Sequence, residues 1–248
     1  MIFTRQTDKY APTDPLLLKA TLKKDPKDVR DYTIGKVGFK LPESASLMQW
    51  QTPVKNQGKL SSCGAFAGVA ALEMLRKRFT GSNLDLSELF LYYNARSHKD
   101  VDNGTYLRDV CKSLQKDGIA LEQFWPYQQE KWKDEPNFAA QFAGKYIKIK
   151  GYYRCKDIDS IKGAITLNQP VLIGLKIYSD FLTLRDDTYT LNKKAKSIGG
   201  HAMMVVGYSD YNVFVKNSWG KQWGKEGYTA LSPSYVKKNL LDAWTVTL

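Results

Sequence analysis

The sequence of 248 residues has few of the side chains that disulfide frameworks and metal sites need: three cysteines, Cys63, Cys111 and Cys155, and two histidines, His98 and His201. Three widely spaced cysteines cannot form the framework that stabilises small secreted proteins, and they exclude a four-thiolate zinc site. This cysteine usage fits a reducing compartment. We therefore expect no metal and no cofactor.

Long apolar stretches are also missing. No run of about 18 apolar residues exists, and the first residues, MIFTRQTDKYAPTDP, lack the apolar core of a secretory signal. We expect no membrane span, and a cytoplasmic or virion-associated location is favoured. The formal net charge of +12 comes mostly from scattered lysines. Because an arginine-rich stripe with interleaved aromatic residues is lacking, we expect no specific nucleic-acid binding, and no oligomeric state is favoured.

The composition nevertheless predicts a folded protein, because 43% hydrophobic residues can fill a substantial core. Residues 1–40 contain three prolines and clustered charges without a sustained period. They predict an extended N-terminal arm over the surface, or alternatively a short inhibitory segment in a cleft. Residues 41–248 predict one catalytic domain, with a helical lobe over about 50–145 and a β-rich lobe over about 146–248.

The clearest helix begins at Cys63, where Ser61 and Ser62 are natural caps, and Gly81 ends it. Two more helices are expected, in SELFLYYNARS with Ser87 as cap and in TYLRDVCKSLQKDG, whose Cys111 faces the core. Strand patterns with turns between them follow from Tyr146 onward: KYIKIKGYY, QPVLIGLKI, HAMMVVGY, YNVFVKNSW and GYTAL. A mainly helical half therefore precedes a mainly β half.

Cys63 is the candidate nucleophile, because a helix N-terminus and a nearby imidazolium lower a thiol pKa to roughly 3.5 to 7.5. An isolated cysteine at a helix start is usually structural, so the hypothesis needs partners. His98 is expected in solvent, whereas His201 opens an apolar strand and is the better base. Asn217 could accept the His201 N–H and fix its tautomer, with Trp219 shielding that bond from water.

Three segments, VKNQGKLSSCGAF, GGHAMMVVGY and VKNSWGKQWGKEGY, closely resemble the nucleophile, histidine and asparagine segments of papain-like cysteine peptidases. The histidine and asparagine follow Cys63 at about the separation, 130 to 150 residues, that this family shows. Weaker similarity in LPESASLMQWQTPVKNQG, LSELFLYY, DNGTY and NQPV extends the match over about 41–231. The resemblance implies an α+β, papain-like two-lobe fold: a helical lobe and a β-barrel-like lobe with the active-site cleft between them.

The resemblance also implies roles. Cys63 would be the nucleophile, His201 the base and later the acid, and Asn217 the group that orients the histidine. Gln57 would donate its amide N–H to the oxyanion together with the Cys63 backbone N–H. Substrate would be bound at four positions, and these are Gly104, Thr105, Gly200 and Trp219.

The chain departs from the family signature CG(S/A)C(W/Y), because Leu60 replaces the first cysteine and Gly64 the aromatic residue. The resemblance places the disulfide partner of that first cysteine near Asp102, so both halves are missing together. This pattern resembles the bacterial and viral branch. Thr105 also replaces a glycine expected to approach the substrate, which affects the expected shape of the cleft.

The favoured function is therefore a cysteine endopeptidase acting on polypeptides through a Cys63 acyl-enzyme. Two alternatives stay open. A related thiol amidase or acyltransferase would need the same three groups, and a papain-like body could serve as a catalytically silent binding or structural module of a larger assembly.

Overall fold

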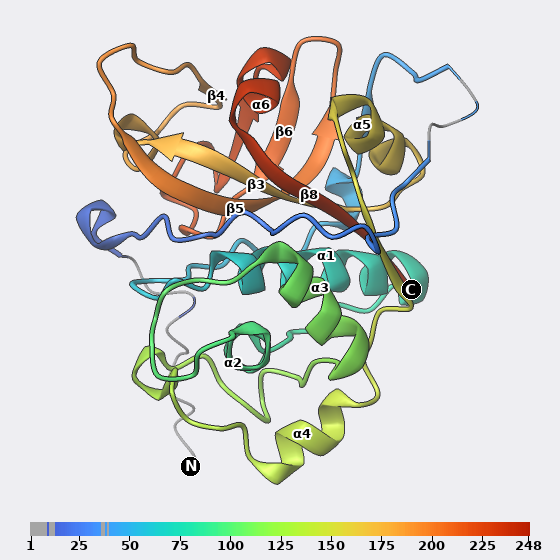
Figure 1. Ribbon diagram of the computed structural model, residues 1–248, viewed down its shortest axis with the longest axis vertical. Coiled ribbons are helices and arrows are strands. Elements are labelled where there is room, and N and C mark those ends of the chain that lie inside the picture. The colour runs from blue at the N-terminus through green and yellow to red at the C-terminus, as the bar shows by residue number, and fades with distance from the viewer. Residues whose placement is uncertain (1–8, 10–12, 36–37, 39) are drawn as a thin grey trace.

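The computed structural model describes residues 9, 13–35, 38 and 40–248. Its elements form two layers, with a sheet in the upper half of Figure 1 and α1 to α4 in the lower half. No helix among the described residues is long and apolar enough to cross a membrane. The α-helices in the described part are α1 (Cys63–Thr80), α2 (Glu88–Ala95), α3 (Leu107–Lys116), α4 (Phe138–Gly144), α5 (Ile158–Thr166) and α6 (Pro233–Asn239).

The sheet has the order β2-β8-β3-β5-β6-β7-β4, and β1 pairs with β5. All pairs in it are antiparallel except β4 with β7. It is open-ended rather than a closed barrel within the described residues, and the expected α+β two-lobe arrangement is otherwise confirmed. Its strands are β1 (Ala45–Ser46), β2 (Gly151–Arg154), β3 (Val171–Tyr178), β4 (Thr188–Tyr189), β5 (Ser197–Tyr208), β6 (Val213–Lys216), β7 (Tyr228–Leu231) and β8 (Leu240–Thr247).

The three expected helices are confirmed as α1, α2 and α3. Gly81 ends α1 in the left-handed conformation, with φ 72°, and its N–H donates to Lys77 O. The Ser87 side chain caps α2 by accepting from the Phe90 N–H, as expected. The strand β8 was not expected from the sequence, although it lies between β2 and β3 in the sheet.

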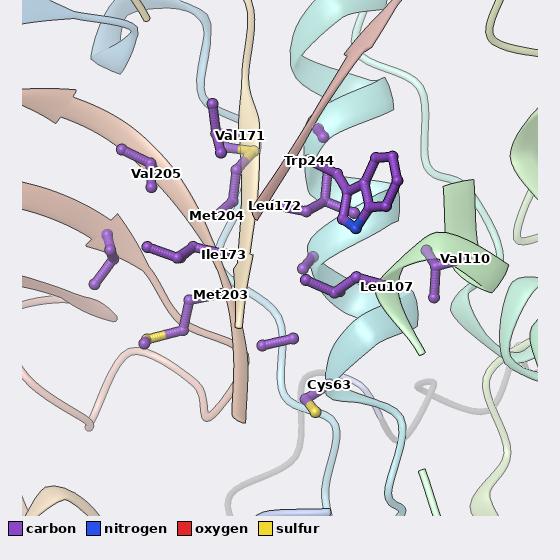
Figure 2. Close-up of a cluster of buried hydrophobic side chains, with 14 of the residues drawn as sticks. Cys63, Leu107, Val110, Val171, Leu172, Ile173, Met203, Met204, Val205 and Trp244 are labelled. Carbon is purple, nitrogen blue, oxygen red and sulfur yellow. The ribbon is translucent and has the colours of Figure 1, made fainter. Parts of the chain in front are cut away.

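The hydrophobic core joins the two layers. Figure 2 shows Trp244 of β8 and Leu172 of β3 facing Leu107 and Val110 of α3, with Cys63 at one end of the cluster. Each of these side chains is at most 1% exposed. The nucleophile candidate is therefore anchored to the largest packed region of the molecule.

A buried ionic network also joins the layers, and its centre is Glu73 of α1, which is 1% exposed. Its carboxylate accepts from Lys55 Nζ at 2.6 Å and from Thr52 Oγ1 at 2.8 Å. Lys216 of β6 in turn donates to Thr52 O at 2.7 Å. The network thus runs from the helix that begins at Cys63 to the strand that ends beside Asn217.

The N-terminal arm, residues 13–35, runs between the sheet and α1 and α3 as the blue stretch in Figure 1. It is extended apart from a 3-10 turn at Pro15–Leu17 and a turn at 29–30, which the Asp31 N–H closes by donating to Asp28 O. Asp25 fixes it, because this carboxylate accepts from Trp244 Nε1 at 2.7 Å and its own N–H donates to Asp242 at 2.6 Å. The arm is therefore packed into the body of the molecule.

We predict that Glu73→Ala lowers the free energy of unfolding by about 3 to 5 kcal/mol, because the buried Thr52 hydroxyl and Leu86 N–H would lose their acceptor. Lys55 would also lose one of its three carboxylate partners. Urea unfolding followed by fluorescence measures the change. Glu130→Ala is the matched control, since Glu130 is exposed. Equal stability of the two variants would contradict a central structural role of the network.

Candidate active site between the two layers

Cys63 is the first residue of α1, and it is 1% exposed. Ser62 occupies the N-cap position, but its side chain makes no capping bond and instead shares a hydrogen bond of 2.9 Å with the Tyr127 hydroxyl. Ser61 Oγ donates to Asp102 O. The expectation that these serine side chains cap the helix is therefore wrong, and the positive end of the helix dipole is left uncapped beside the thiol.

His201 lies within β5 rather than at its start, and it is fully buried. Its Nε2 is 2.7 Å from Asn217 Oδ1. Because an amide oxygen only accepts, Nε2 carries the proton, and Nδ1 is left as a basic nitrogen. Within the described part of the chain, that Nδ1 has no hydrogen-bond partner. The Trp219 ring covers the pair, with its centroid 4.2 Å from that of the imidazole.

The Cys63 thiol lies against the strand of His201, across the two layers. A hydrogen bond from the backbone N–H of Ala202, the residue after His201, acts on the Cys63 thiol. Burial nevertheless dominates and raises the pKa of Cys63 to about 11, whereas it lowers the pKa of His201 to about 4. In this closed arrangement thiol and imidazole are therefore both neutral near pH 7.

Gln57 connects the two sides of the site. Its Nε2 donates to Leu60 O at 2.8 Å, and its Oε1 accepts from Ser218 Oγ at 2.7 Å. The Gln57 backbone N–H donates to Ser218 O at 2.8 Å. One amide proton of Gln57 thus stays free of the Leu60 bond, in a side chain held rigidly between the segments of Cys63 and Asn217.

The arm contacts the backbone at three of the expected substrate positions. Leu22 N–H donates to Gly200 O at 2.9 Å, and Lys23 N–H donates to Thr105 O at 3.2 Å. Gly104 has φ 79°, and a Cβ there would lie 2.2 Å from Thr21 O. A side chain at position 104 would therefore push the arm out of its place.

A family model described as "Papain family cysteine protease" matches residues 41–241. The chain belongs to the papain family of cysteine proteases. The match covers the nucleophile, histidine and asparagine segments and both layers of the fold. Membership of this family makes the chain a cysteine-type peptidase by descent, as its sequence predicted.

Individual relatives agree with this assignment. A peptidase C1-like protein of Acanthamoeba polyphaga mimivirus is 33% identical over 77% of this chain and 68% of its own length. Chymopapain of Carica papaya is 31% identical over 73% of this chain, but the match spans only 51% of chymopapain. Among solved structures, xylellain, a cysteine protease from Xylella fastidiosa, has a TM-score of 0.85 at 26% identity, covering 100% of this chain and 99% of that one. Bacterial and viral proteins are thus among the relatives, as expected.

Two departures from the papain-family pattern prove to be complementary in space. A Cβ on Gly64 would lie 2.4 Å from Thr105 Oγ1 and 3.3 Å from a Val110 methyl group. The threonine therefore fills the space in which the family has an aromatic side chain at position 64. All three cysteines are free and buried, in agreement with the expected loss of the family disulfide.

Several groups that build the site were not identified from the sequence. Ser218 was identifiable as the neighbour of Asn217, but nothing in the pattern linked it to Gln57. Tyr127, whose hydroxyl donates to Gln57 O at 2.7 Å, lies in a stretch without a periodic pattern. Asp102 was noted only as the site of a missing cysteine, yet its Oδ1 accepts from the Ser61 N–H at 2.9 Å.

We predict that His201→Gln removes part of the acid sensitivity of the fold. An unfolded histidine takes up a proton below pH 6.5, whereas the buried His201 does so only near pH 4, so stability is lost as pH falls through this window. Wild type should lose about 2 kcal/mol more than His201→Gln between pH 7 and pH 4.5, by urea unfolding. His98→Gln, at the exposed histidine, is the control, and identical pH profiles of wild type and His201→Gln would refute the assignment.

Proposed function

We propose that this chain hydrolyses peptide bonds of polypeptides between its two lobes, with Cys63 as nucleophile and His201 as general base and acid. One observation carries the proposal: the thiol at an uncapped helix start lies against Ala202, beside an imidazole whose Nε2 is bound to Asn217. The proposal treats 41–248 as the catalytic domain and 1–40 as an extended arm.

In the proposed reaction His201 Nδ1 takes the thiol proton as the sulfur attacks the substrate carbonyl carbon. The Asn217 amide oxygen holds the Nε2–H, which keeps Nδ1 directed to proton transfer. The free amide proton of Gln57 and the Cys63 backbone N–H would stabilise the oxyanion. His201 then protonates the leaving amine, and a water activated by Nδ1 hydrolyses the thioester.

Substrate backbone would bind where the arm now lies, at Gly104, Thr105 and Gly200, with Trp219 on the far side of the histidine. The arm uses the carbonyl oxygens of Gly200 and Thr105, so arm and substrate compete for the same acceptors. We therefore propose that the arm holds the enzyme latent until it is displaced. Residues 1–40 were expected to form either an extended arm over the surface or a short inhibitory segment in a cleft. These contacts support the inhibitory segment.

We predict that iodoacetamide labels Cys63 faster than Cys111 and Cys155. We also predict that His201→Ala slows the hydrolysis of a fluorogenic peptide by about 10² to 10⁴-fold, which is the usual contribution of a general base. Intact mass locates the label, and initial rates give kcat/KM. Cys63→Ser should abolish both signals, and His98→Ala should change neither. Equal labelling of the three cysteines, or hydrolysis that survives Cys63→Ser, would rule the mechanism out.

The arm gives a separate prediction. Leu22 is 5% exposed, and its Cδ2 lies so close to Gly174 that a Cβ there would be 2.5 Å away. Leu22→Ala leaves a cavity in this contact, so the arm should open more often and the labelling rate of Cys63 should rise about tenfold or more. Leu16→Ala is the matched control, since Leu16 is 84% exposed. An unchanged rate in folded Leu22→Ala would show that the arm does not limit access.

A further inference from the structure

Asp102 is held rigidly beside the nucleophile. Its Oδ1 accepts from the Ser61 N–H at 2.9 Å and from the Tyr92 hydroxyl, and its backbone oxygen accepts from Ser61 Oγ at 3.1 Å. Ser61 lies two residues before Cys63, and Gly104 lies two residues after Asp102. One carboxylate oxygen is thus fully used in fixing the loop, and the direction of the other oxygen is set by these bonds.

That second oxygen binds a cation from the arm. Asp102 Oδ2 is 2.7 Å from Lys19 Nζ, and the two side chains are 13% and 44% exposed, respectively. Lys19 stands two residues before Thr21, whose carbonyl oxygen lies against Gly104. The lysine therefore belongs to the segment that lies over the expected substrate positions.

The charge state of Asp102 suits this contact. Burial alone would raise the pKa of Asp102, but the bonds from Lys19, Tyr92 and Ser61 outweigh it and hold the pKa below its ordinary value. The ionised carboxylate also raises the pKa of the Cys63 thiol, although less than burial does. A cation bound at Asp102 therefore offsets a charge that works against thiolate formation.

We propose that Asp102 is a specificity-determining residue that favours peptides with a lysine or arginine near the cleaved bond, on the side of the cleft lined by Ser61 and Gly104. In the closed structure Lys19 stands in for that side chain. Once the arm leaves, Oδ2 lies uncovered in the cleft, and a basic side chain of the substrate restores the ion pair. This assignment rests on the proposed peptidase function.

The test compares two fluorogenic peptide series on the full-length protein, identical except for arginine or glutamine at each of the three residues before the scissile bond. Wild type should show kcat/KM about tenfold or more higher for arginine at one of these positions, the usual strength of a hydrogen bond to a charged group. Asp102→Asn should bring the ratio close to one. The asparagine oxygen can still accept from Ser61 and Tyr92, so the loop keeps its bonds.

The ratio is independent of how often the arm opens, because the open fraction multiplies both kcat/KM values equally. Asp100→Asn is the matched control, since Asp100 is exposed two residues away. A wild-type ratio near one, or a ratio that Asp102→Asn leaves unchanged, would overturn the proposal. A uniform loss for both peptides would show that Asp102 acts only as a structural clamp.

A double-mutant cycle tests the same recognition without turnover. Lys19→Gln and Asp102→Asn should each raise the iodoacetamide labelling rate of Cys63 several-fold, and the double variant should be no faster than either. Additive effects would refute a direct Lys19–Asp102 interaction. Should the cycle show coupling while no peptide is hydrolysed, the proposed function would fail, but the carboxylate would still be a site for basic side chains.

Discussion

The site depends on the contact between two layers that supply different halves of the chemistry. Cys63 begins the helix α1, whereas His201 lies in β5 and Asn217 follows β6, so a small shift between the layers would move the thiol away from the strand of His201. The buried carboxylate of Glu73 opposes that shift, because it lies on the helix of Cys63 and binds Lys55 and Thr52. A charged group in the interior costs desolvation energy, and here the bonds that offset this cost also set the register of the layers.

The start of α1 lacks a side-chain cap, and this absence also serves the site. A serine side chain that capped α1 would accept an N–H of its first turn, such as that of Gly64, which acts on the Cys63 thiol instead. Ser62 instead binds Tyr127, and Tyr127 binds Gln57 O, so the hydroxyl groups fix the loop and leave the helix start open. Stability is supplied by neighbours of the site, while the N–H groups at the start of α1 stay directed to the Cys63 thiol.

Much of this arrangement could be predicted from the sequence. Local patterns predicted the helices, and the family resemblance indicated the site residues. The bounds of α1 follow from its apolar period and from Gly81. Cys63, His201 and Asn217 lie in the three segments that resemble the papain-like family. The course of the arm could not be predicted, because its bonds to Gly200 and Thr105 are made by backbone groups that any sequence possesses. The strand β8 was missed because LLDAWTVT, buried on both sides, follows a short helix without a turn signal. Tyr127 and Asp102 act through contacts far apart in the chain, which no local period encodes.

The closed arrangement also determines how reactive the thiol is. A thiolate is the form that attacks carbonyl groups and that oxidants modify, and its fraction depends on solvation. Burial holds the Cys63 pKa at about 11 and the His201 pKa at about 4, so the covered pair keeps its proton on sulfur. In the proposed mechanism, displacing the arm would admit water or a polar substrate and weaken the desolvation that is the largest cause of both shifts. In the proposed mechanism, occupation of the cleft and protonation of the nucleophile are therefore two consequences of one contact, and the arm would control chemistry as well as access.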